Sequence, residues 1–170
     1  MNTVIRFLFW QNVFNINYWI RLLVEFVCKG DFIKFKIIVD AHLKNWNKIR
    51  FFLNSYIDKL NFNMDEKNIF LLACEEVFDN ICHYAYKNLS GKIEFKLEFK
   101  DKIAKIEISD TGVKFDPTHF KYLEDDIRKP SSKRRIGGMG IYIINQIMDK
   151  IEYQRKHNQN YLFLFKILVK

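Results

Sequence analysis

Nine consecutive residues, from Lys92 to Lys100, alternate strictly between charged and apolar side chains. The apolar members are Ile93, Phe95, Leu97 and Phe99, and every residue between them is Lys or Glu. Successive side chains of a β-strand point to opposite faces of its sheet, so this pattern predicts a strand with one face buried and the other in water. The chain must therefore build a sheet that packs its core on one side.

The rest of the chain supplies further elements in an informative order. The segments with strand or helical spacing are strand 32–39, helix 42–60, a second helix 65–87 with Asp65 as its expected N-cap, strands 92–100 and 102–110, helix 141–150, and strands 151–157 and 161–169, the last two joined by a turn around 158–159. No strand–helix–strand alternation is present, which indicates an α+β fold. We expect a two-layer sandwich with a mixed, mostly antiparallel sheet and helices on one face.

Residues 1–30 stand apart from this scheme. Their apolar run is interrupted by Arg6, Arg21 and Glu25, so its longest uncharged stretch is too short to span a membrane, and it carries no signal-peptide cleavage pattern. We interpret it as an extension of one or two amphipathic helices ahead of a single domain in residues 31–170. The extension has three open readings: a docking element, a membrane-surface element, or an upstream addition from a misassigned start codon.

Charge and cysteine content narrow the classes of partner. The 170 residues suffice for one domain and carry a net charge of +8. Lysines and acidic residues are interleaved, which favours a solvated surface as the reason for the excess charge. The densest basic patch is 129–135. A nucleic-acid binder is the alternative, although no helix rich in Lys and Arg is present. Cys28, Cys74 and Cys82 have no metal or redox spacing, which favours a reducing cytoplasm.

The second predicted helix carries a polar stripe beside its apolar one. The expected core stripe is Phe70, Cys74, Val77, Ile81 and Tyr84. Glu76, Asn80 and His83 fall on another face, and Glu76 and Asn80 are one turn apart. An amide oxygen from Asn80 suits a hard cation such as Mg²⁺, and Glu76 could accept a proton from a nucleophile. On this helix alone, an exposed polar face is the alternative, and His83 is interpreted as a structural or surface residue.

Two further motifs follow. Asp110 ends a strand on its inward face, where a carboxylate needs a partner such as the exocyclic amine of adenine, and Gly112 would let a flat ring approach the backbone. Residues 136–141 (IGGMGI) precede a helix, where backbone amides favour phosphate, but they fit neither the Rossmann nor the Walker pattern. Residues 111–135 form a long irregular loop, which is usually functional.

In this order the three motifs resemble those of the GHKL superfamily of ATPases, which includes gyrase, histidine kinases and MutL. They are most similar to the RsbW-type anti-sigma factor serine kinases. The matching stretches are EEVFDNICHYAYKN (75–88), ISDTGVKFDP (108–117) and RRIGGMGIYIINQIMDKIEYQRKHNQNYLFLFK (134–166). The resemblance covers residues 32–169 and implies a Bergerat-type fold that binds ATP and Mg²⁺.

The resemblance also implies roles for single residues. Asn80 would ligate Mg²⁺, Glu76 would be the general base, and Asp110 would bind the adenine amine. The other residues expected to line the nucleotide are Gly112, Gly138, Met139 and Gly140. Residues 118–136 would form a lid over the phosphates, and its candidate phosphate contacts are Lys133, Arg134 and Arg135. Many relatives have His four residues after the Asn, where this chain has Tyr84.

By the same resemblance, the chain would be a cytoplasmic, homodimeric protein serine kinase without direct nucleic-acid contact. It would bind a sigma factor in one state and phosphorylate a serine of a STAS-type anti-sigma antagonist in another. Histidine kinases resemble one another in having Asn at the position of Glu76, so Glu76 favours chemistry on a hydroxyl group or water. The alternative is a nucleotide-dependent protein-binding switch without kinase activity. The sequence does not name the sigma factor or the antagonist.

Overall fold

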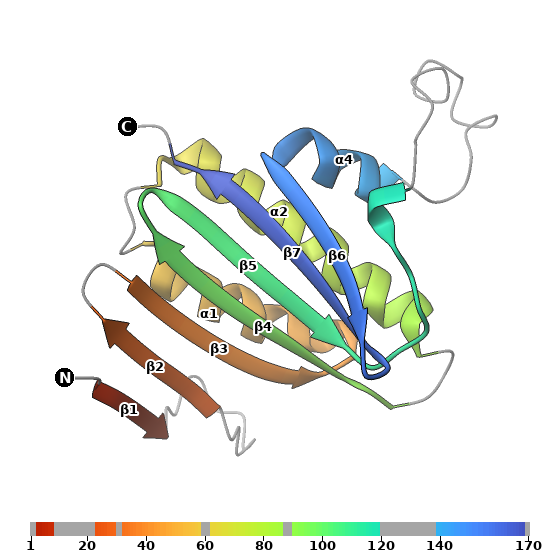
Figure 1. Cartoon of the computed structure of the whole chain (residues 1–170), viewed down its shortest axis with the longest axis horizontal. Helices are drawn as coiled ribbons and strands as arrows, with labels where there is room; N and C mark the ends of the chain where they lie inside the picture. The colour runs from red at the N-terminus through yellow and green to blue at the C-terminus, as the bar shows by residue number, and fades with distance from the viewer. Residues whose placement is uncertain are drawn as a thin grey trace.

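One sheet with helices on a single face makes up the described part of the chain (Figure 1). The computed structural model describes residues 3–8, 23–29, 32–58, 62–86, 90–119 and 139–168. The strands are β1 (Thr3–Leu8), β2 (Leu23–Lys29), β3 (Phe32–Asp40), β4 (Lys92–Lys100), β5 (Ile103–Asp110), β6 (Lys150–Lys156) and β7 (Gln159–Ile167). The helices are α1 (Trp46–Ile57), α2 (Met64–Asn80) and α4 (Met139–Ile147), with short helical turns η1 (Leu43–Asn45), η2 (Ile81–Ala85) and η3 (Pro117–His119).

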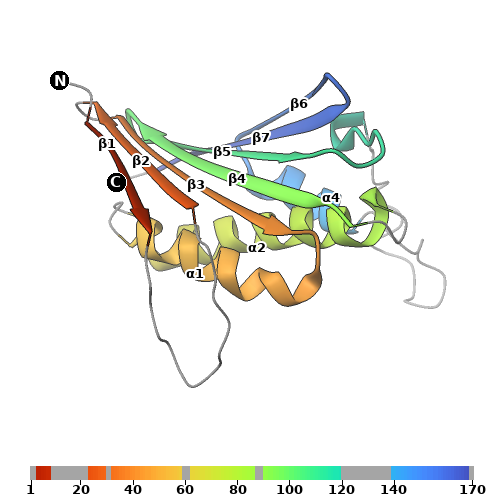
Figure 2. The same ribbon diagram turned by 90° about the horizontal axis from the view of Figure 1, so that it is seen from below.

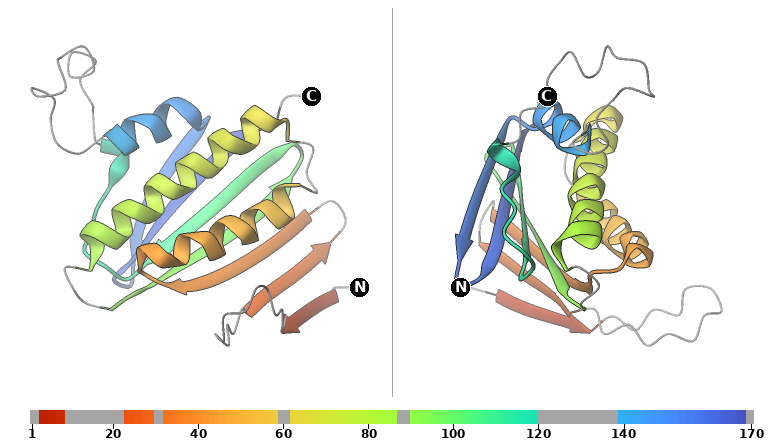
Figure 3. Two further views of the ribbon diagram at one scale, coloured as in Figure 1. Left: turned by 180° about the vertical axis from the view of Figure 1, so that it is seen from behind. Right: turned by 90° about the vertical axis from the view of Figure 1, so that its right-hand side faces the viewer.

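The strands follow the order β1-β2-β3-β4-β5-β7-β6, and each neighbouring pair in the described residues is antiparallel. Views along the sheet show α1, α2 and α4 on the same face (Figures 2 and 3). The predicted two-layer α+β sandwich is confirmed. The sheet contains no parallel pair among these strands, where we expected a mixed sheet, because β7 lies between β5 and β6 and separates the two strands that run in the same direction.

The alternation predicted for residues 92–100 is confirmed, since the apolar members of β4 face the helices. The helix-facing positions of the central strands are buried: Phe35, Ile37, Val39, Ile93, Phe95, Leu97, Ala104, Ile106, Ile108, Leu162 and Leu164. Each large apolar side chain buried in this way contributes roughly 1.5–3 kcal/mol to folding. On the opposite face Lys96 Nζ lies 2.7 Å from both Glu94 Oε1 and Glu107 Oε1, so that face is solvated and carries ion pairs.

The start of α2 differs from expectation by two residues. Its N-cap is Asn63, not Asp65: Asn63 Oδ1 accepts from the Glu66 N–H at 2.8 Å, and Glu66 Oε2 accepts from the Asn63 N–H at 2.9 Å. This reciprocal pair is a capping box, which satisfies two backbone donors at once and therefore outcompetes a single Asp cap.

The end of α2 widens into the π-helical turn η2, and the widening changes which residues face the core. Tyr84, expected in the core stripe, is 66% exposed, whereas Ala85 and Tyr86 are buried. A π turn contains more residues than an α turn, so the three-and-four spacing that holds up to Val77 no longer predicts the buried face beyond Asn80. Such turns are frequently found at functional sites.

A tight turn sets the register of the last two strands. His157 and Asn158 both have positive φ values, of 49° and 60°, as two-residue hairpin turns require. The turn therefore lies one residue earlier than we expected. It places Arg155 of β6 opposite Asn160 of β7, and Asn160 is in turn opposite Asp110 of β5.

The expectation of helices within residues 1–30 is wrong for the part that the structure describes. Residues 3–8 and 23–29 form the antiparallel strands β1 and β2, and β2 pairs with β3, so they extend the sheet. Both segments are rich in β-branched and aromatic residues, which favour strands. The described helices include none that is both long enough and apolar enough to span a membrane.

Candidate functional site

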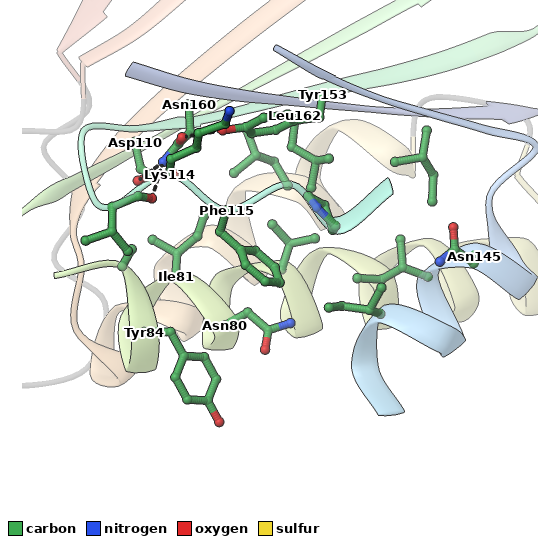
Figure 4. Close-up of a pocket in the computed structure, with 18 residues that line it drawn as sticks. Asn80, Ile81, Tyr84, Asp110, Lys114, Phe115, Asn145, Tyr153, Asn160 and Leu162 are labelled. Carbon is green, nitrogen blue, oxygen red and sulfur yellow. Dashed lines mark hydrogen bonds between the residues drawn. The ribbon is translucent and has the colours of Figure 1, made fainter. Parts of the chain in front are cut away.

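An open cavity of about 870 Å³ lies between α2 and η2, the start of α4 and the end of β5 (Figure 4). Its wall is mainly apolar: Val77, Ile81, Ala85, Ile108, Val113, Phe115, Pro117, Ile141, Ile144, Ile151 and Leu162. The polar side chains on the wall are Asn80, Tyr84, Asp110, Lys114, Asn145, Tyr153 and Asn160. A mostly apolar wall with a few polar groups is typical of a small-molecule site.

Asp110 is the buried carboxylate of this cavity, with 5% of its surface exposed. Its Oδ1 accepts from the Gly112 N–H at 2.7 Å and from Asn160 Nδ2 at 3.0 Å. Burial raises the pKa of Asp110, and the hydrogen bonds from Asn160 and Gly112 and the charge of Arg155 act against that shift. Both hydrogen bonds from described residues end on Oδ1, which leaves Oδ2 to accept a hydrogen bond from a ligand.

Gly112 is not among the residues that line the cavity. The Val113 N–H donates to the Ala85 carbonyl at 2.8 Å, which brings the loop after β5 against the end of η2. A Cβ on Gly112 would lie 2.5 Å from the Ala85 Cβ and 2.6 Å from its carbonyl oxygen. Glycine is therefore needed here for a backbone-to-backbone approach, and the approach of a flat ring to Gly112 stays a prediction.

Asn80 ends α2 on the helical side of the cavity, and in Figure 4 it lies across from Asp110 and Asn160. Its side chain makes no capping hydrogen bond, and no described residue pairs with it. A half-buried amide with its oxygen unused fits a hard cation that keeps phosphate and water in its coordination shell. The described residues contain no group of three or more His, Cys, Asp or Glu that could hold a metal.

Glu76 lies one turn before Asn80 but is not part of the cavity wall. Its carboxylate is next to Gly140 in the first turn of α4, and a Cβ on Gly140 would overlap Oε2. Burial is the main cause that raises the pKa of Glu76, and the negative charges of Asp79 and Glu75 add to it. A carboxylate whose proton affinity is raised in this way is a better base than an exposed one.

The cavity thus brings together two of the predicted site residues, Asn80 and Asp110. Gly140 lies beside Glu76, and Met139 begins α4. The remaining predicted contacts, Lys133, Arg134, Arg135 and Gly138, lie outside the described residues, as does most of the expected lid. His83 is exposed, and its Nδ1 donates to the Asp79 carbonyl at 2.8 Å, in line with the surface or structural role that we expected.

Sequence patterns assigned no role to Asn160, Tyr153 or Arg155. Asn160 donates to Asp110, and both Tyr153 and Arg155 donate to Asn160. We expected a turn around 158–159 and a strand from 161, which left Asn160 outside both, but the hairpin turn lies at residues 157–158 and Asn160 is an inward position of β7. A polar residue two positions before the buried Leu162 was the available signal, since period two places both on the same face.

Comparisons with known proteins identify the family of this domain. The family described as the histidine kinase-like ATPase domain matches residues 39–166. The serine-protein kinases RsbW of Bacillus thuringiensis (strain Al Hakam) and Bacillus anthracis (strain CDC 684 / NRRL 3495) are each 30% identical over 106 residues. The match covers 61% of this chain and 66% of each kinase, just under two thirds of the length of these relatives.

A solved structure shows the same fold. The RsbU and RsbW domains of a Mycobacterium tuberculosis protein align with a TM-score of 0.54 and 12% identity, covering 78% of this chain and 32% of that one. The family match spans most of the chain and contains the cavity, Asn80 and Asp110. This chain therefore belongs to the histidine kinase-like ATPase domain family.

Proposed function

We propose that this chain binds Mg²⁺-ATP in the cavity and transfers the γ-phosphoryl group to a serine of a partner protein. The observation that carries the proposal is the position of two polar side chains on opposite sides of an apolar cavity. One is the buried carboxylate of Asp110, and the other is the amide of Asn80, which makes no capping hydrogen bond. Family membership supports the nucleotide, and the RsbW serine-protein kinases among the relatives support a protein serine as the acceptor.

The base end of the nucleotide lies at Asp110 in this proposal. Oδ2 accepts a hydrogen bond from the exocyclic amine of adenine, while Ile108, Val113 and Leu162 contact the ring. Guanine carries a carbonyl oxygen at the corresponding position, which would face a carboxylate oxygen without a proton between them. The site therefore selects adenine over guanine by leaving the wrong base with an unpaired acceptor.

The phosphate end lies toward Asn80 and the start of α4. The oxygen of Asn80 would hold Mg²⁺, which when bound neutralises charge on the β- and γ-phosphates. Glu76 accepts the proton of the acceptor serine, whose oxygen forms a bond to the γ-phosphorus while the bond to the bridging oxygen of ADP breaks. The N-terminal amides of α4, together with Lys133, Arg134 and Arg135, would contact the phosphates.

The acceptor and partners follow from the same relatives. We propose a STAS-type anti-sigma antagonist as the phosphorylated protein and a sigma factor as the alternative ligand of a cytoplasmic homodimer. Residues 1–30 would then be an extension that lengthens the sheet beyond the domain of residues 31–170, since β2 pairs with β3. Cys74 and Cys82 are free thiols, which suits a reducing compartment.

A single-turnover assay tests the kinase step. Radiolabelled ATP is incubated with the parent, Glu76→Ala or Glu75→Ala and a STAS-domain protein from the same genome, and nucleotide affinity is measured on the same preparations. We expect Glu76→Ala to keep its ATP affinity but to lose about 10²–10⁴ in transfer rate, the usual cost of removing a general base. Glu75→Ala removes the same group one residue away and should retain the parent rate within a few fold.

One observation favours a second function. Glu76 lies beside Gly140 and is absent from the cavity wall, which fits a structural carboxylate in a nucleotide-dependent binding switch. Tight ATP binding by the parent without transfer to any STAS protein would favour the switch. Equal transfer rates for Glu76→Ala and the parent would exclude Glu76 as the base.

A further inference from the structure

A row of three polar residues crosses the end of the sheet at the cavity. Asp110 of β5 is opposite Asn160 of β7, and Asn160 is opposite Arg155 of β6. All three occupy helix-facing positions, because Ile108, Leu162 and Tyr153 are two residues from them on the same strands and line the cavity. Arg155 itself is not on the cavity wall.

Asn160 connects the two ends of this row and uses its whole amide to do so. Its Nδ2 donates to Asp110 Oδ1 and to the Val113 carbonyl, each at 3.0 Å. Its Oδ1 accepts from Tyr153 Oη at 2.8 Å and from Arg155 Nη1 at 2.6 Å. An arginine can only donate and a carbonyl can only accept, so these partners fix which way the amide faces.

Arg155 holds a second point of the same loop. Its Nη1 also donates to the Gly112 carbonyl at 3.1 Å. The Gly112 N–H donates to Asp110 Oδ1, and the Val113 N–H donates to the Ala85 carbonyl. One guanidinium nitrogen therefore joins the β6–β7 hairpin to the loop that follows β5, at the Gly112 carbonyl.

The consequence concerns Asp110. With Oδ1 held by Asn160 and Gly112, rotation of the carboxylate would break two hydrogen bonds in a buried environment, which is costly. Oδ2 is then presented in a fixed direction. Loss of Arg155 would leave Tyr153 as the one side chain described at Asn160 Oδ1 and would release the Gly112 carbonyl. Both changes would loosen the carboxylate without removing any atom of the cavity wall.

We propose that Arg155 is the positioning residue of the adenine site, acting through Asn160 and Gly112 to aim the carboxylate of Asp110. This inference rests on the proposed function, because it assigns purine selectivity to the cavity. Arg155 is half-buried and 45 residues from Asp110 in the sequence, yet only Asn160 lies between them in the sheet. The charge of Arg155 also favours the ionised form of Asp110, which is the form that accepts a hydrogen bond from an amine.

The test measures ATP and GTP affinities by calorimetry for the parent, Arg155→Met and Arg155→Lys. Lys156→Met is the matched control, because it removes a positive charge from the next residue of β6, which is exposed. We expect Arg155→Met to weaken ATP binding roughly tenfold while GTP binding changes less than twofold, a coupling of ordinary size between contacting groups. Arg155→Lys should retain part of the preference, and Lys156→Met all of it.

A double-mutant cycle shows whether Arg155 acts through Asp110. In an Asp110→Asn background, Arg155→Met should cause little further loss of ATP affinity, since the carboxylate that it aims is already gone. Equal losses of ATP and GTP affinity in Arg155→Met, or fully additive losses in the cycle, would overturn the proposal. A general loss of folding would lower both affinities together, and melting temperatures identify that case.

Failure of the proposed function has a different signature. If the parent binds neither nucleotide, the adenine site is wrong, and hydrogen exchange at the Gly112 amide decides whether Arg155 holds the loop. Faster exchange in Arg155→Met than in Lys156→Met would support the positioning role. Equal exchange would show that the loop does not depend on Arg155.

Discussion

The carboxylate of Glu76 on α2 occupies the space that a side chain on Gly140 of α4 would need. A Cβ built on Gly140 would overlap Oε2 of Glu76 and lie 3.1 Å from its Cδ. The two helices thus meet where the proposed base lies beside the proposed phosphate-binding helix start. The missing side chain of Gly140 allows Glu76 to keep this position.

Replacement of Gly140 by alanine should separate folding from catalysis. The overlapping atom is the end of a flexible side chain, so Glu76 can rotate away, and alanine is about 0.5–1 kcal/mol better than glycine inside a helix. We expect Gly140→Ala to retain or raise the melting temperature while phosphoryl transfer slows at least about tenfold. Adding Gly140→Ala to Glu76→Ala should then slow transfer little further, and an unchanged rate in Gly140→Ala alone would contradict the prediction.

Gly112 should behave in the opposite way. A Cβ on Gly112 would lie 2.6 Å from a backbone atom, the Ala85 carbonyl oxygen. This oxygen cannot move without breaking its hydrogen bond from the Val113 N–H. We expect Gly112→Ala to lower the free energy of unfolding by about 1–3 kcal/mol, as overpacking does, measured by urea denaturation. Ala85→Gly in the same chain should restore only part of this loss, because the carbonyl oxygen remains. An unchanged urea midpoint in Gly112→Ala would show that the loop can shift.

The sequence predicted the fold well where a single period runs through an element. Alternation over residues 92–100 identified the half-buried strand, and the same period over residues 102–110 placed Asp110 on the inward face. Prediction failed where local geometry breaks the period. The π turn after Asn80 exposes Tyr84, and the capping box puts the N-cap of α2 at Asn63 where we expected Asp65.

The candidate site was predictable in part for the same reason. Asn80 and Asp110 carry recognisable motifs and both lie on the cavity wall. Arg155 carries no motif, and its link to Asp110 depends on the strand order β5-β7-β6. A chain read from end to end gives no sign that β7 lies between the other two strands, so the residue row that holds Asp110 becomes visible only in the structure.

Removal of the Asn80 amide should abolish the magnesium dependence of nucleotide binding. The side chain of Asn80 makes no capping hydrogen bond and lies on the cavity wall, so Asn80→Ala should leave the melting temperature nearly unchanged. Calorimetric titrations with ATP, with and without Mg²⁺, should show the parent gaining affinity from the metal and the variant gaining little. Asn145→Ala is the control, since it removes an exposed amide on the wall from α4. A full magnesium effect in Asn80→Ala would remove Asn80 from the metal site.

The low-pH side of the profile of transfer rate against pH, its acid limb, should depend on the environment of Glu76. A general base works in its deprotonated form, and the pKa of Glu76 is raised above its ordinary value of 4.5 by burial and then by the charges of Asp79 and Glu75. The rate should therefore fall as the pH drops through a value higher than that of an exposed glutamate. Asp79→Asn removes the stronger of the two charge effects, which should lower the pKa of Glu76 and move the limb to lower pH.

The variant leaves the backbone carbonyl of Asp79 in place, so the hydrogen bond from His83 is retained. Asp65→Asn is the matched control, because it removes the same charge from the far end of α2, about three turns from Glu76. Single-turnover rates between pH 5 and 8 should show the shift in Asp79→Asn only. Coincident acid limbs in the parent and Asp79→Asn would mean that the titrating group is not Glu76, and an equal shift in Asp65→Asn would point to net charge as the cause.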